Sequence, residues 1–236
     1  MQLMQEITAS GEIDTLVPER VWKETEKALA ERHPDIFLQT LRECGALAII
    51  FPELDRLFGV PQPEKWHPEI DCGVHTLMVL EQAAKLSEDL DVRYAGLVHD
   101  LGKATTDKSA LPSHPGHEAR SVKLVRKMAK RLPIPNGCRD LGCLAAEFHT
   151  HCHRAFELRA STILKVLNST DAFRRPERFE KFIVACEADS RGRTGFEDNE
   201  YPQANYLRGA MAAATSVNID DLNNTQRITF NIKGDK

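Results

Sequence analysis

Hydrophobic positions recur at helical spacing along most of the chain, and proline or glycine marks many of the intervals between them. Residues 18–32 place their apolar side chains on one side of a helix that Pro18 can open. Pro34 can begin a second helix, which we expect Gly45 to end. The same periodicity predicts further helices over residues 73–87, 117–131, 139–150, 160–170, 176–190 and 202–214.

One more helix is expected directly before the most polar part of the pattern. Asp91 can cap this helix, which buries one apolar face and carries His99 and Asp100 at its carboxy end. Gly102 is then expected to break it. The chain shows no alternation of strands with helices and no internal repeat, so the pattern predicts an all-α fold.

The last part of the chain has a different character. From Ser216 onward asparagine is frequent, and Ile228, Phe230 and Ile232 alternate with polar residues as in a short strand. A strand without a partner is only marginally stable, so we expect disorder or an intermolecular contact here.

Composition indicates a protein without a membrane-spanning segment. The 236 residues, 42% of them hydrophobic, suffice for a substantial core in one large or two closely packed domains. The longest apolar run, residues 46–51, is far too short to span a bilayer, and no secretory leader is visible. Six cysteines without Cys-x-x-Cys pairing favour reduced thiols and a cytoplasmic location.

Charge is unevenly distributed along the chain. The formal charge of −4 argues against tight binding of nucleic acid, because phosphate contacts need clustered cations. Basic residues nevertheless recur at helical spacing in one expected helix and gather again further on. They are Arg120, Lys123, Arg126, Lys127, Lys130 and Arg131 in the helix, and Arg174, Arg175, Arg178 and Lys181 in the second cluster. Each group is either a solvated helix face or a weak contact with a nucleic-acid backbone.

The most informative chemistry is the adjacent pair His99-Asp100. Imidazole and carboxylate together suit a divalent metal ion, which can activate water near neutral pH and polarise a phosphoryl oxygen. Three further histidines, His75, His117 and His149, occur in order around the pair. The set therefore predicts a metal site held by these five residues and a further acidic residue.

This ordered set resembles the HD superfamily of metal-dependent phosphohydrolases. Four other segments resemble the carboxy-terminal half of the bacterial multifunctional CCA proteins, which are tRNA nucleotidyltransferases that carry an HD domain. The segments read PERVWKE at residues 18–24, WHPEID at 66–71, DAFRRP at 171–176 and EADSRGR at 187–193. The resemblance covers roughly residues 5–215 and implies an HD-type helical architecture behind a helical neck and body.

The resemblance also implies a division of the chain. Residues 1–60 would form the end of the neck and the helical body, residues 61–215 the HD phosphohydrolase domain, and residues 216–236 a tail that departs from the family. The family's nucleotidyltransferase head has a Gly-Gly-x-Val-Arg-Asp segment and a magnesium-holding pair of carboxylates, and neither appears in this sequence. We therefore expect no CCA addition from this chain alone.

The activities that the resemblance implies are those of a 2′,3′-cyclic phosphodiesterase, 2′-nucleotidase and phosphatase acting on cyclic or phosphorylated nucleotides, with tRNA as a weakly bound partner. The candidate tRNA-binding residues are Lys123, Lys127, Lys130, Arg174 and Arg175. Imidazole-rich ligands favour nickel, cobalt or manganese, with magnesium a poorer match.

Two other functions are compatible with the sequence. One is a tRNA-binding or oligomerisation module, such as a homodimer, with a degenerate metal site. The other is an HD protein that senses nucleotides or hydrolyses deoxynucleotides, although the segments at 18–24 and 187–193 favour the CCA family.

Two of the histidine ligands are chosen from close competitors. His117 is preferred to His114 because it opens the basic helix and can turn its ring back toward the cluster. His149 is preferred to His151 and His153, although spacing alone does not separate the three. His33 and His67 are expected to be structural.

The acidic ligand that closes the site is the least defined. Where the superfamily usually has an aspartate, a few residues ahead of an Asp-Ala pair, this chain has Asn168. We expect Asp171 to replace it, with Asp189 as the other contender.

Lys103 is expected to act in catalysis beside His99 and Asp100, because its charge can stabilise a phosphate oxygen. Neutralising the carboxy end of a helix dipole is the alternative role for Lys103.

Overall fold

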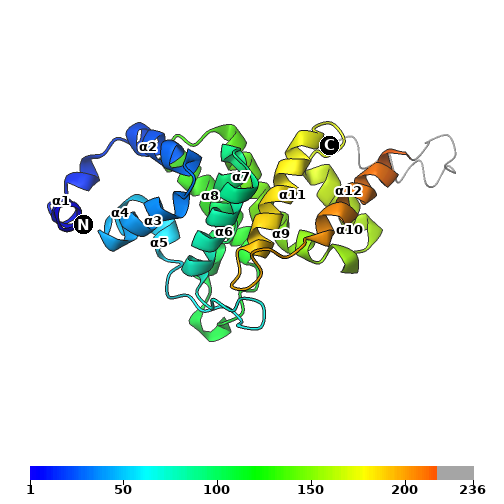
Figure 1. Ribbon diagram of the computed structural model, residues 1–236, viewed down its shortest axis with the longest axis horizontal. Coiled ribbons are helices and arrows are strands. Elements are labelled where there is room, and N and C mark those ends of the chain that lie inside the picture. Colours follow the sequence, from blue (N-terminus) through cyan, green and yellow to red (C-terminus); the bar gives the residue numbers. More distant parts are fainter. Residues whose placement is uncertain (217–236) are drawn as a thin grey trace.

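The computed structural model describes residues 1–216, and their regular structure consists of twelve α-helices and four short 3₁₀-helices (Figure 1). The α-helices are α1 (Gln2–Ala9), α2 (Pro18–Ala30), α3 (Pro34–Glu43), α4 (Ala46–Ile50), α5 (Pro52–Asp55), α6 (Cys72–Leu86), α7 (Leu90–Val98), α8 (His117–Arg131), α9 (Asn136–His153), α10 (Ala160–Ser169), α11 (Pro176–Arg191) and α12 (Pro202–Thr215). The 3₁₀-helices are η1 (Glu12–Thr15), η2 (Leu101–Thr105), η3 (Lys108–Ala110) and η4 (Ala155–Glu157). The all-α fold is confirmed, and the strand expected around Ile228, Phe230 and Ile232 lies outside the described residues.

The helices are arranged along one long axis. Helices α1–α5 lie at one end, α10 and α12 lie at the other, and α6–α9 with α11 form the middle (Figure 1). One buried core joins α2–α5 to α6–α8, and a second joins α7 to α9–α12. Because the first core crosses residue 60, the expected division into 1–60 and 61–215 does not coincide with a break in packing and stays a prediction.

Helix α7 is the central element of this arrangement. Every residue from Val92 to Val98 is buried, and the helix contributes side chains to both cores. A short helix buried on all sides carries whatever follows it into the protein interior. Here His99 and Asp100 follow it directly, and both are buried.

Arg93, in the middle of α7, connects this helix to the carboxy ends of α2 and α6. Its guanidinium donates to the carbonyl oxygens of Leu29 (2.6 Å) and Glu31 (2.7 Å) at the end of α2, and to that of Ser87 (2.8 Å) after α6. Carbonyls at helix carboxy ends lack partners within their own helix, so one buried cation satisfies several of them at once.

Two details near α7 correct the sequence analysis. Asp89, not Asp91, caps the helix, because its side chain accepts a hydrogen bond from the backbone N–H of Asp91 at 2.9 Å. Gly102 does not end the helical path, since the chain continues into η2. Its lack of a side chain is required for packing: a Cβ atom there would lie 2.1 Å from the carbonyl oxygen of His117.

None of the helices within residues 1–216 combines the length and the apolar character needed to cross a membrane.

Candidate metal centre

Four histidines and two aspartates from five helical segments meet in the middle of the structure. The residues are His75 in the first turn of α6, His99 and Asp100 directly after α7, His117 at the start of α8, His149 in α9 and Asp189 in α11. His117 is partly buried and the other five are buried. The structure therefore brings together all the histidines and the His-Asp pair that the sequence nominated.

The four imidazole rings share one hydrogen-bonding pattern. The Nδ1 atom of each ring lies within hydrogen-bond distance of a backbone carbonyl oxygen: His75 with Gly192 (2.9 Å), His99 with Gly96 (2.7 Å), His117 with His114 (2.8 Å) and His149 with Ala145 (2.8 Å). A carbonyl can only accept, so Nδ1 carries the hydrogen and Nε2 of the neutral ring has a free lone pair. This is the arrangement by which proteins orient histidines that bind a metal.

The two oxygens of Asp100 face different partners. Oδ1 lies 3.3 Å from Nε2 of His117 and 3.5 Å from Nε2 of His149, and those two nitrogens are 3.4 Å apart. Oδ2 lies 3.1 Å from Nε2 of His99 and 2.7 Å from Nζ of Lys103. The carboxylate thus stands between two groups of nitrogen ligands.

Asp189 closes the other side of the cluster. Its Oδ1 lies 3.0 Å from Nε2 of His75 and 3.6 Å from Nε2 of His99. Its Oδ2 is held at 2.6 Å by Nε2 of His153, and the hydroxyl of Tyr201 lies 3.0 Å from Nδ1 of that ring. His153 therefore orients the carboxylate from behind.

The donor set fits a divalent cation. Nε2 of His99 and Oδ1 of Asp100 are buried without a hydrogen-bond partner, a costly state unless something else satisfies these atoms. Ligands about 2.1 Å from one ion, at angles of about 90–109°, lie about 3.0–3.4 Å apart, close to the spacings in this cluster. Within residues 1–216, overlapping groups of three residues bring their possible ligand atoms within 4.8 Å of one another, and one such group is Asp100 with His117 and His149.

Burial and charge act in opposite directions on the ionisable groups of the cluster. Burial by itself would lower the pKa of His99, but Asp100 and Asp189 raise it to about 10. Burial opposes ionisation of Asp100, while His99 and Lys103 hold its pKa well below the ordinary value. Burial lowers the pKa of His149 to about 3, so that ring stays neutral and able to donate its lone pair.

Lys103 lies inside the cluster as a buried cation. Its ammonium group contacts Asp100 at 2.7 Å and donates to the side-chain oxygen of Gln62 at 2.8 Å. Burial opposes its charge, and Asp100 raises the pKa of Lys103 above the ordinary value. Lys103 also lines the cavity in front of the cluster, where its charge is available to an anion.

Glu69 is a member of the cluster that sequence reasoning missed. Its Oε1 lies 3.1 Å from Nδ1 of His75 and 3.0 Å from Nδ1 of His67. The turn before α6 places it there: Asp71 caps the helix by accepting from the backbone N–H groups of Gly73 and Val74. The signal was present in the WHPEID segment, which contributed to the family resemblance but not to the site.

His67, for which a structural role is expected, lies beside the cluster with Glu69 and His75. It contacts Glu69 and lines the cavity, and burial lowers its pKa to about 4.

Asp171, the expected acidic ligand, does not lie in the cluster. Its carboxylate lies 2.7 Å from Nε of Arg174 and 3.6 Å from Nε of Arg175, and it belongs to none of the candidate metal groups within residues 1–216. Its backbone has a φ of 58°, which places it in the turn after α10 rather than on a helix facing the site. The contender Asp189 lies in one of those groups with His99 and His149, and Asn168 is exposed in the last turn of α10.

The remaining candidates lie outside the cluster. His114 binds the carbonyl of Pro61 and the hydroxyl of Thr106. The proposed RNA-binding side chains Lys123, Lys127 and Lys130 are exposed along α8, which begins at the cluster with His117.

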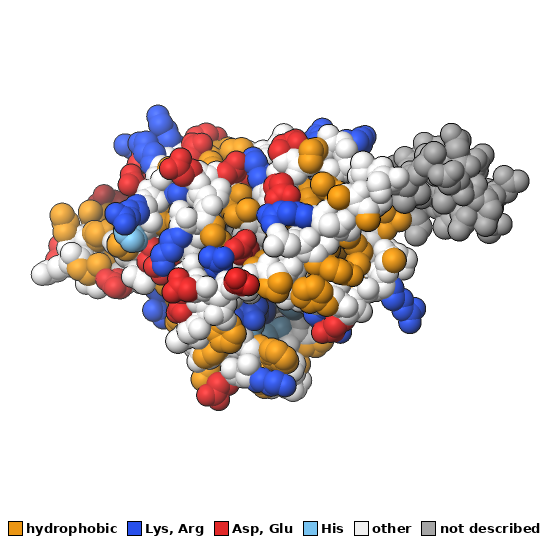
Figure 2. All heavy atoms as spheres, turned by 45° about the vertical axis from the view of Figure 1, so that its right-hand side comes forward, with side chains coloured by type: hydrophobic (Ala, Val, Ile, Leu, Met, Phe, Trp, Pro, Cys, Tyr) orange, Lys and Arg blue, Asp and Glu red, His pale blue; other side chains and the backbone are white. Residues whose placement is uncertain are grey.

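A cavity of about 610 Å³ opens in front of the cluster. Asp100, Lys103, His117, His149 and Asp189 form its floor, and the rim includes the side chains of Trp66, His67, His153, Arg154, Glu157 and Arg193. Figure 2 shows histidine atoms recessed in a hollow on the face it presents. The volume lies in the range of small-molecule sites.

Comparison with known proteins gives two family matches. Residues 2–58 match the family described as the probable RNA and SrmB-binding site of polymerase A, and residues 73–178 match the HD domain. The chain is 61% identical over 222 residues to a multifunctional CCA protein of Thioalkalivibrio sulfidiphilus, and 54% identical over 222 residues to one of Pseudomonas fluorescens. Each alignment covers 94% of this chain and 54% of the relative, so the chain spans about half the length of the curated relatives it matches.

Proposed function

We propose that this chain, which matches the HD domain over residues 73–178 and is similar to the carboxy-terminal half of multifunctional CCA proteins, is a metal-dependent phosphohydrolase for nucleotide 2′,3′-cyclic phosphates and phosphomonoesters. One observation carries the proposal. Four imidazoles have Nδ1 committed to backbone carbonyls and turn Nε2 toward two buried carboxylates.

The ligands divide into two subsites that share Asp100. His75, His99 and Asp189 surround one side, facing Oδ2 of the shared carboxylate. His117 and His149 surround the other side, facing Oδ1. We assign one divalent ion to each subsite, with Asp100 as the ligand common to both. The nitrogen-rich ligand set favours nickel, cobalt or manganese over magnesium.

A bound divalent ion would supply activation of water near neutral pH and polarisation of a phosphoryl oxygen. The chain's own residues supply the positioning: His153 fixes the orientation of Asp189, and Glu69 fixes the ring of His75. Lys103 places a buried positive charge at the cavity floor, where it can stabilise the negative charge that develops on the phosphate.

The overall reaction with a cyclic phosphate is a hydrolysis. The water oxygen forms a bond to phosphorus, one ribose oxygen leaves, and a proton passes to that oxygen, giving a phosphomonoester. Further hydrolysis of the monoester would release inorganic phosphate. This is the chemistry expected of an enzyme that trims damaged tRNA ends.

We assign weak tRNA binding to the exposed basic face of α8. The segment matched to the RNA-binding family has eleven acidic and six basic residues, so its charge alone does not favour phosphate contacts. Helix α8 has six basic residues and one acidic residue, and its first residue is the ligand His117. A backbone bound along Lys123, Lys127 and Lys130 would therefore lie near the cavity. Arg174 and Arg175 are weaker candidates, since both contact Asp171. A cytoplasmic location and a homodimer stay predictions.

A second candidate function is an RNA-binding module with an inert centre. The observation that favours it is the 2.7 Å contact between Lys103 and Asp100, because an ammonium group at this carboxylate competes with a cation. If Lys103 is not displaced, only the subsite of His117 and His149 retains a free oxygen of Asp100.

Metal content and turnover together test the proposal. The protein should be purified without chelator, its metals measured, and hydrolysis of 2′,3′-cyclic AMP followed before and after chelation. We expect a stoichiometric transition metal and an activity that chelation removes and nickel, cobalt or manganese restores. A metal-free protein without hydrolytic activity after reloading would favour the RNA-binding module.

A further inference from the structure

We propose that Trp66 and Arg193 form a nucleotide subsite on the rim of this cavity, in which the indole stacks on the base and the guanidinium binds the phosphate. The proposal rests on the proposed function and deepens it, because it makes the cavity selective for nucleotides over phosphoesters that lack a base.

Trp66 is an exposed aromatic residue held in a fixed place. Its side chain lines the cavity, although 59% of the residue's surface is exposed. Two backbone hydrogen bonds hold the turn that carries it: the N–H of Trp66 donates to the carbonyl oxygen of Pro63 (3.0 Å), and the N–H of Gln62 donates to that of Ile70 (2.7 Å). Because this indole is exposed, it contributes little to stability through burial. It does provide a flat surface on which a base can stack.

The surroundings of the indole suit an anionic ligand with an aromatic ring. The ammonium group of Lys65 lies 4.6 Å from the ring centroid of Trp66. Among residues 1–216, no aromatic ring pairs with this indole, so a face is available for stacking. Lys65 is exposed, and its charge adds to the attraction for a phosphate.

Among the cations that line the cavity, Arg193 has the longest contact with a carboxylate. Lys103 and Arg154, which also line the cavity, contact carboxylates at 2.7 and 2.8 Å. The nearest carboxylate contact of Arg193 is 4.0 Å, between Nη2 and Oδ1 of Asp189. Its Nε is buried without a hydrogen-bond partner. A guanidinium with free donors beside metal ligands matches the geometry of a phosphate group.

The position of Arg193 is set by the residue before it. The carbonyl of Gly192 accepts the hydrogen bond from His75, and a Cβ atom on Gly192 would lie 2.7 Å from the backbone of Val79. The chain after α11 is therefore pressed against α6 next to the cluster. Arg193 directly follows this contact point in the chain, and it lines the cavity.

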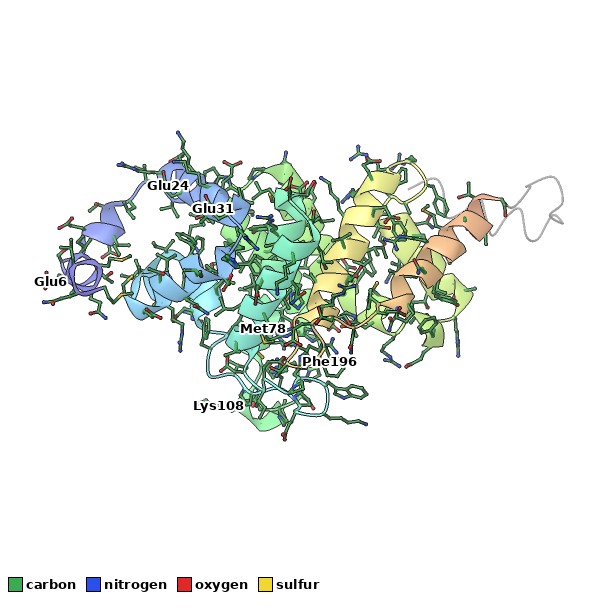
Figure 3. All side chains as sticks on the ribbon, in the orientation of Figure 1. Glu6, Glu24, Glu31, Met78, Lys108 and Phe196 are labelled. Atoms are coloured by element: carbon green, nitrogen blue, oxygen red, sulfur yellow. The ribbon has the colours of Figure 1, made fainter. Side chains whose placement is uncertain are left out.

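The first test compares two substrates that differ only in the base: 2′,3′-cyclic AMP and the 2′,3′-cyclic phosphate of 1-O-methylribose. Trp66→Ala should lower kcat/KM for cyclic AMP roughly tenfold to a hundredfold, mainly through KM, and leave the base-free substrate nearly unchanged. Trp66→Phe should restore most of the loss. Phe196→Ala is the matched control, since Phe196, labelled in Figure 3, is an exposed aromatic residue of the loop after α11 and does not line the cavity.

The second test measures binding without turnover. The chain has two tryptophans, and Trp22 is buried against Tyr94, so Trp22→Phe leaves Trp66 as the only indole reporter. Adenosine 3′-monophosphate should quench its fluorescence saturably, whereas inorganic phosphate should not. If Trp22→Phe does not fold, the difference between the parent and Trp66→Phe gives the same signal.

Arg193 is tested in the same binding assay. Arg193→Ala should weaken the binding of adenosine 3′-monophosphate about tenfold or more, and Arg193→Lys should recover part of the lost affinity. Arg32→Ala, an exposed arginine elsewhere, should have no effect.

These outcomes separate the subsite from the proposed function. Equal losses on both substrates, or no loss on either, would overturn the role of Trp66 while leaving the hydrolase intact. If the parent hydrolyses neither substrate, the proposed function fails and the fluorescence titration alone decides. Saturable quenching would then support the subsite, and its absence would overturn it.

Discussion

Nδ1 of His75 lies 2.9 Å from the carbonyl oxygen of Gly192, a residue 117 positions later in the chain. This contact joins the first turn of α6 to the end of α11, and it fixes which nitrogen of His75 faces Asp189. One backbone carbonyl thereby helps to hold His75 and Asp189, which lie far apart in the sequence, next to each other.

Gly192→Ala tests this contact. The added Cβ would lie 2.5 Å from Cγ2 of Val79 and 2.7 Å from its backbone, and the backbone cannot move aside easily. We expect a loss of about 1–3 kcal/mol in unfolding free energy and a much lower affinity for metal, because the acceptor of His75 is displaced. Urea denaturation and metal titration measure the two effects. Gly209→Ala, in α12 with no atom near the new Cβ, should retain normal metal affinity, and equal behaviour of both variants would contradict the prediction.

Asp100→Ala should abolish metal-dependent hydrolysis, because both subsites lose their shared ligand. Activity toward 2′,3′-cyclic AMP should fall by orders of magnitude, and added metal should no longer raise the melting temperature as it does for the parent. The single variant also leaves the ammonium of Lys103 buried without its carboxylate, which costs about 3–5 kcal/mol.

The double variant Asp100→Ala/Lys103→Met separates these two effects. It should regain much of the lost stability, measured in chelator, but neither the activity nor the response to metal. Normal turnover in a folded protein carrying Asp100→Ala would rule out this centre as the catalytic site.

A matched pair of substitutions distinguishes the two candidate acidic ligands. Asp189→Asn removes the charge beside His75, His99 and His153, so metal content and turnover should both fall by at least tenfold. Asp171→Asn keeps a side chain that tolerates the φ of 58° and breaks only contacts with exposed arginines. It should change unfolding free energy by no more than about 1 kcal/mol and leave turnover intact. The reverse pattern would restore Asp171 as the ligand.

Arg93→Lys should destabilise the protein without a direct effect on the ligands. A lysine ammonium cannot reach the carbonyls of Leu29, Glu31 and Ser87 together, as the guanidinium does. We expect a loss of about 2–4 kcal/mol in unfolding free energy, since buried carbonyls lose charged donors. Chemical denaturation measures it, with metal stoichiometry of the folded variant as the control. An unchanged midpoint would show that these bonds are dispensable.

Replacing Lys123, Lys127 and Lys130 with Glu should remove tRNA binding and leave cyclic AMP hydrolysis unchanged. The three side chains are exposed on α8, and each lost phosphate contact reduces the salt dependence of binding. Fluorescence anisotropy at two salt concentrations measures the change. The comparison variant replaces Arg20, Lys23 and Lys27 with Glu on the exposed face of α2, inside the segment that matches the RNA-binding family. Loss of binding only in that variant would place the RNA contact on α2 instead.

The sequence alone predicted most of the helices and most of the proposed metal ligands. Amphipathic spacing and proline positions predicted α2, α3, α6 and α8–α12 to within a few residues, because these helices bury one face and expose the other. Helices α1, α4 and α5 were not predicted. They contain too few residues for a periodic pattern to be read.

The His-Asp pair, His75, His117 and His149 could be found because their residue types and order are themselves the signal. What only the tertiary structure decided is which distant groups meet them. The sequence favoured Asp171 over Asp189, yet the turn after α10 directs Asp171 to Arg174 while the buried face of α11 brings Asp189 to His75. Glu69 joins the site only because the Asp71 cap turns the chain back at α6.

The choice of coordinating nitrogen was also made by the fold. Each Nδ1 is committed by a carbonyl oxygen, and for His75 that oxygen comes from the far end of the chain. Helical periodicity reports which face of a segment is buried, because that depends on local spacing. It does not report which side chains from different helices share that buried space, and this depends on packing that the whole chain determines.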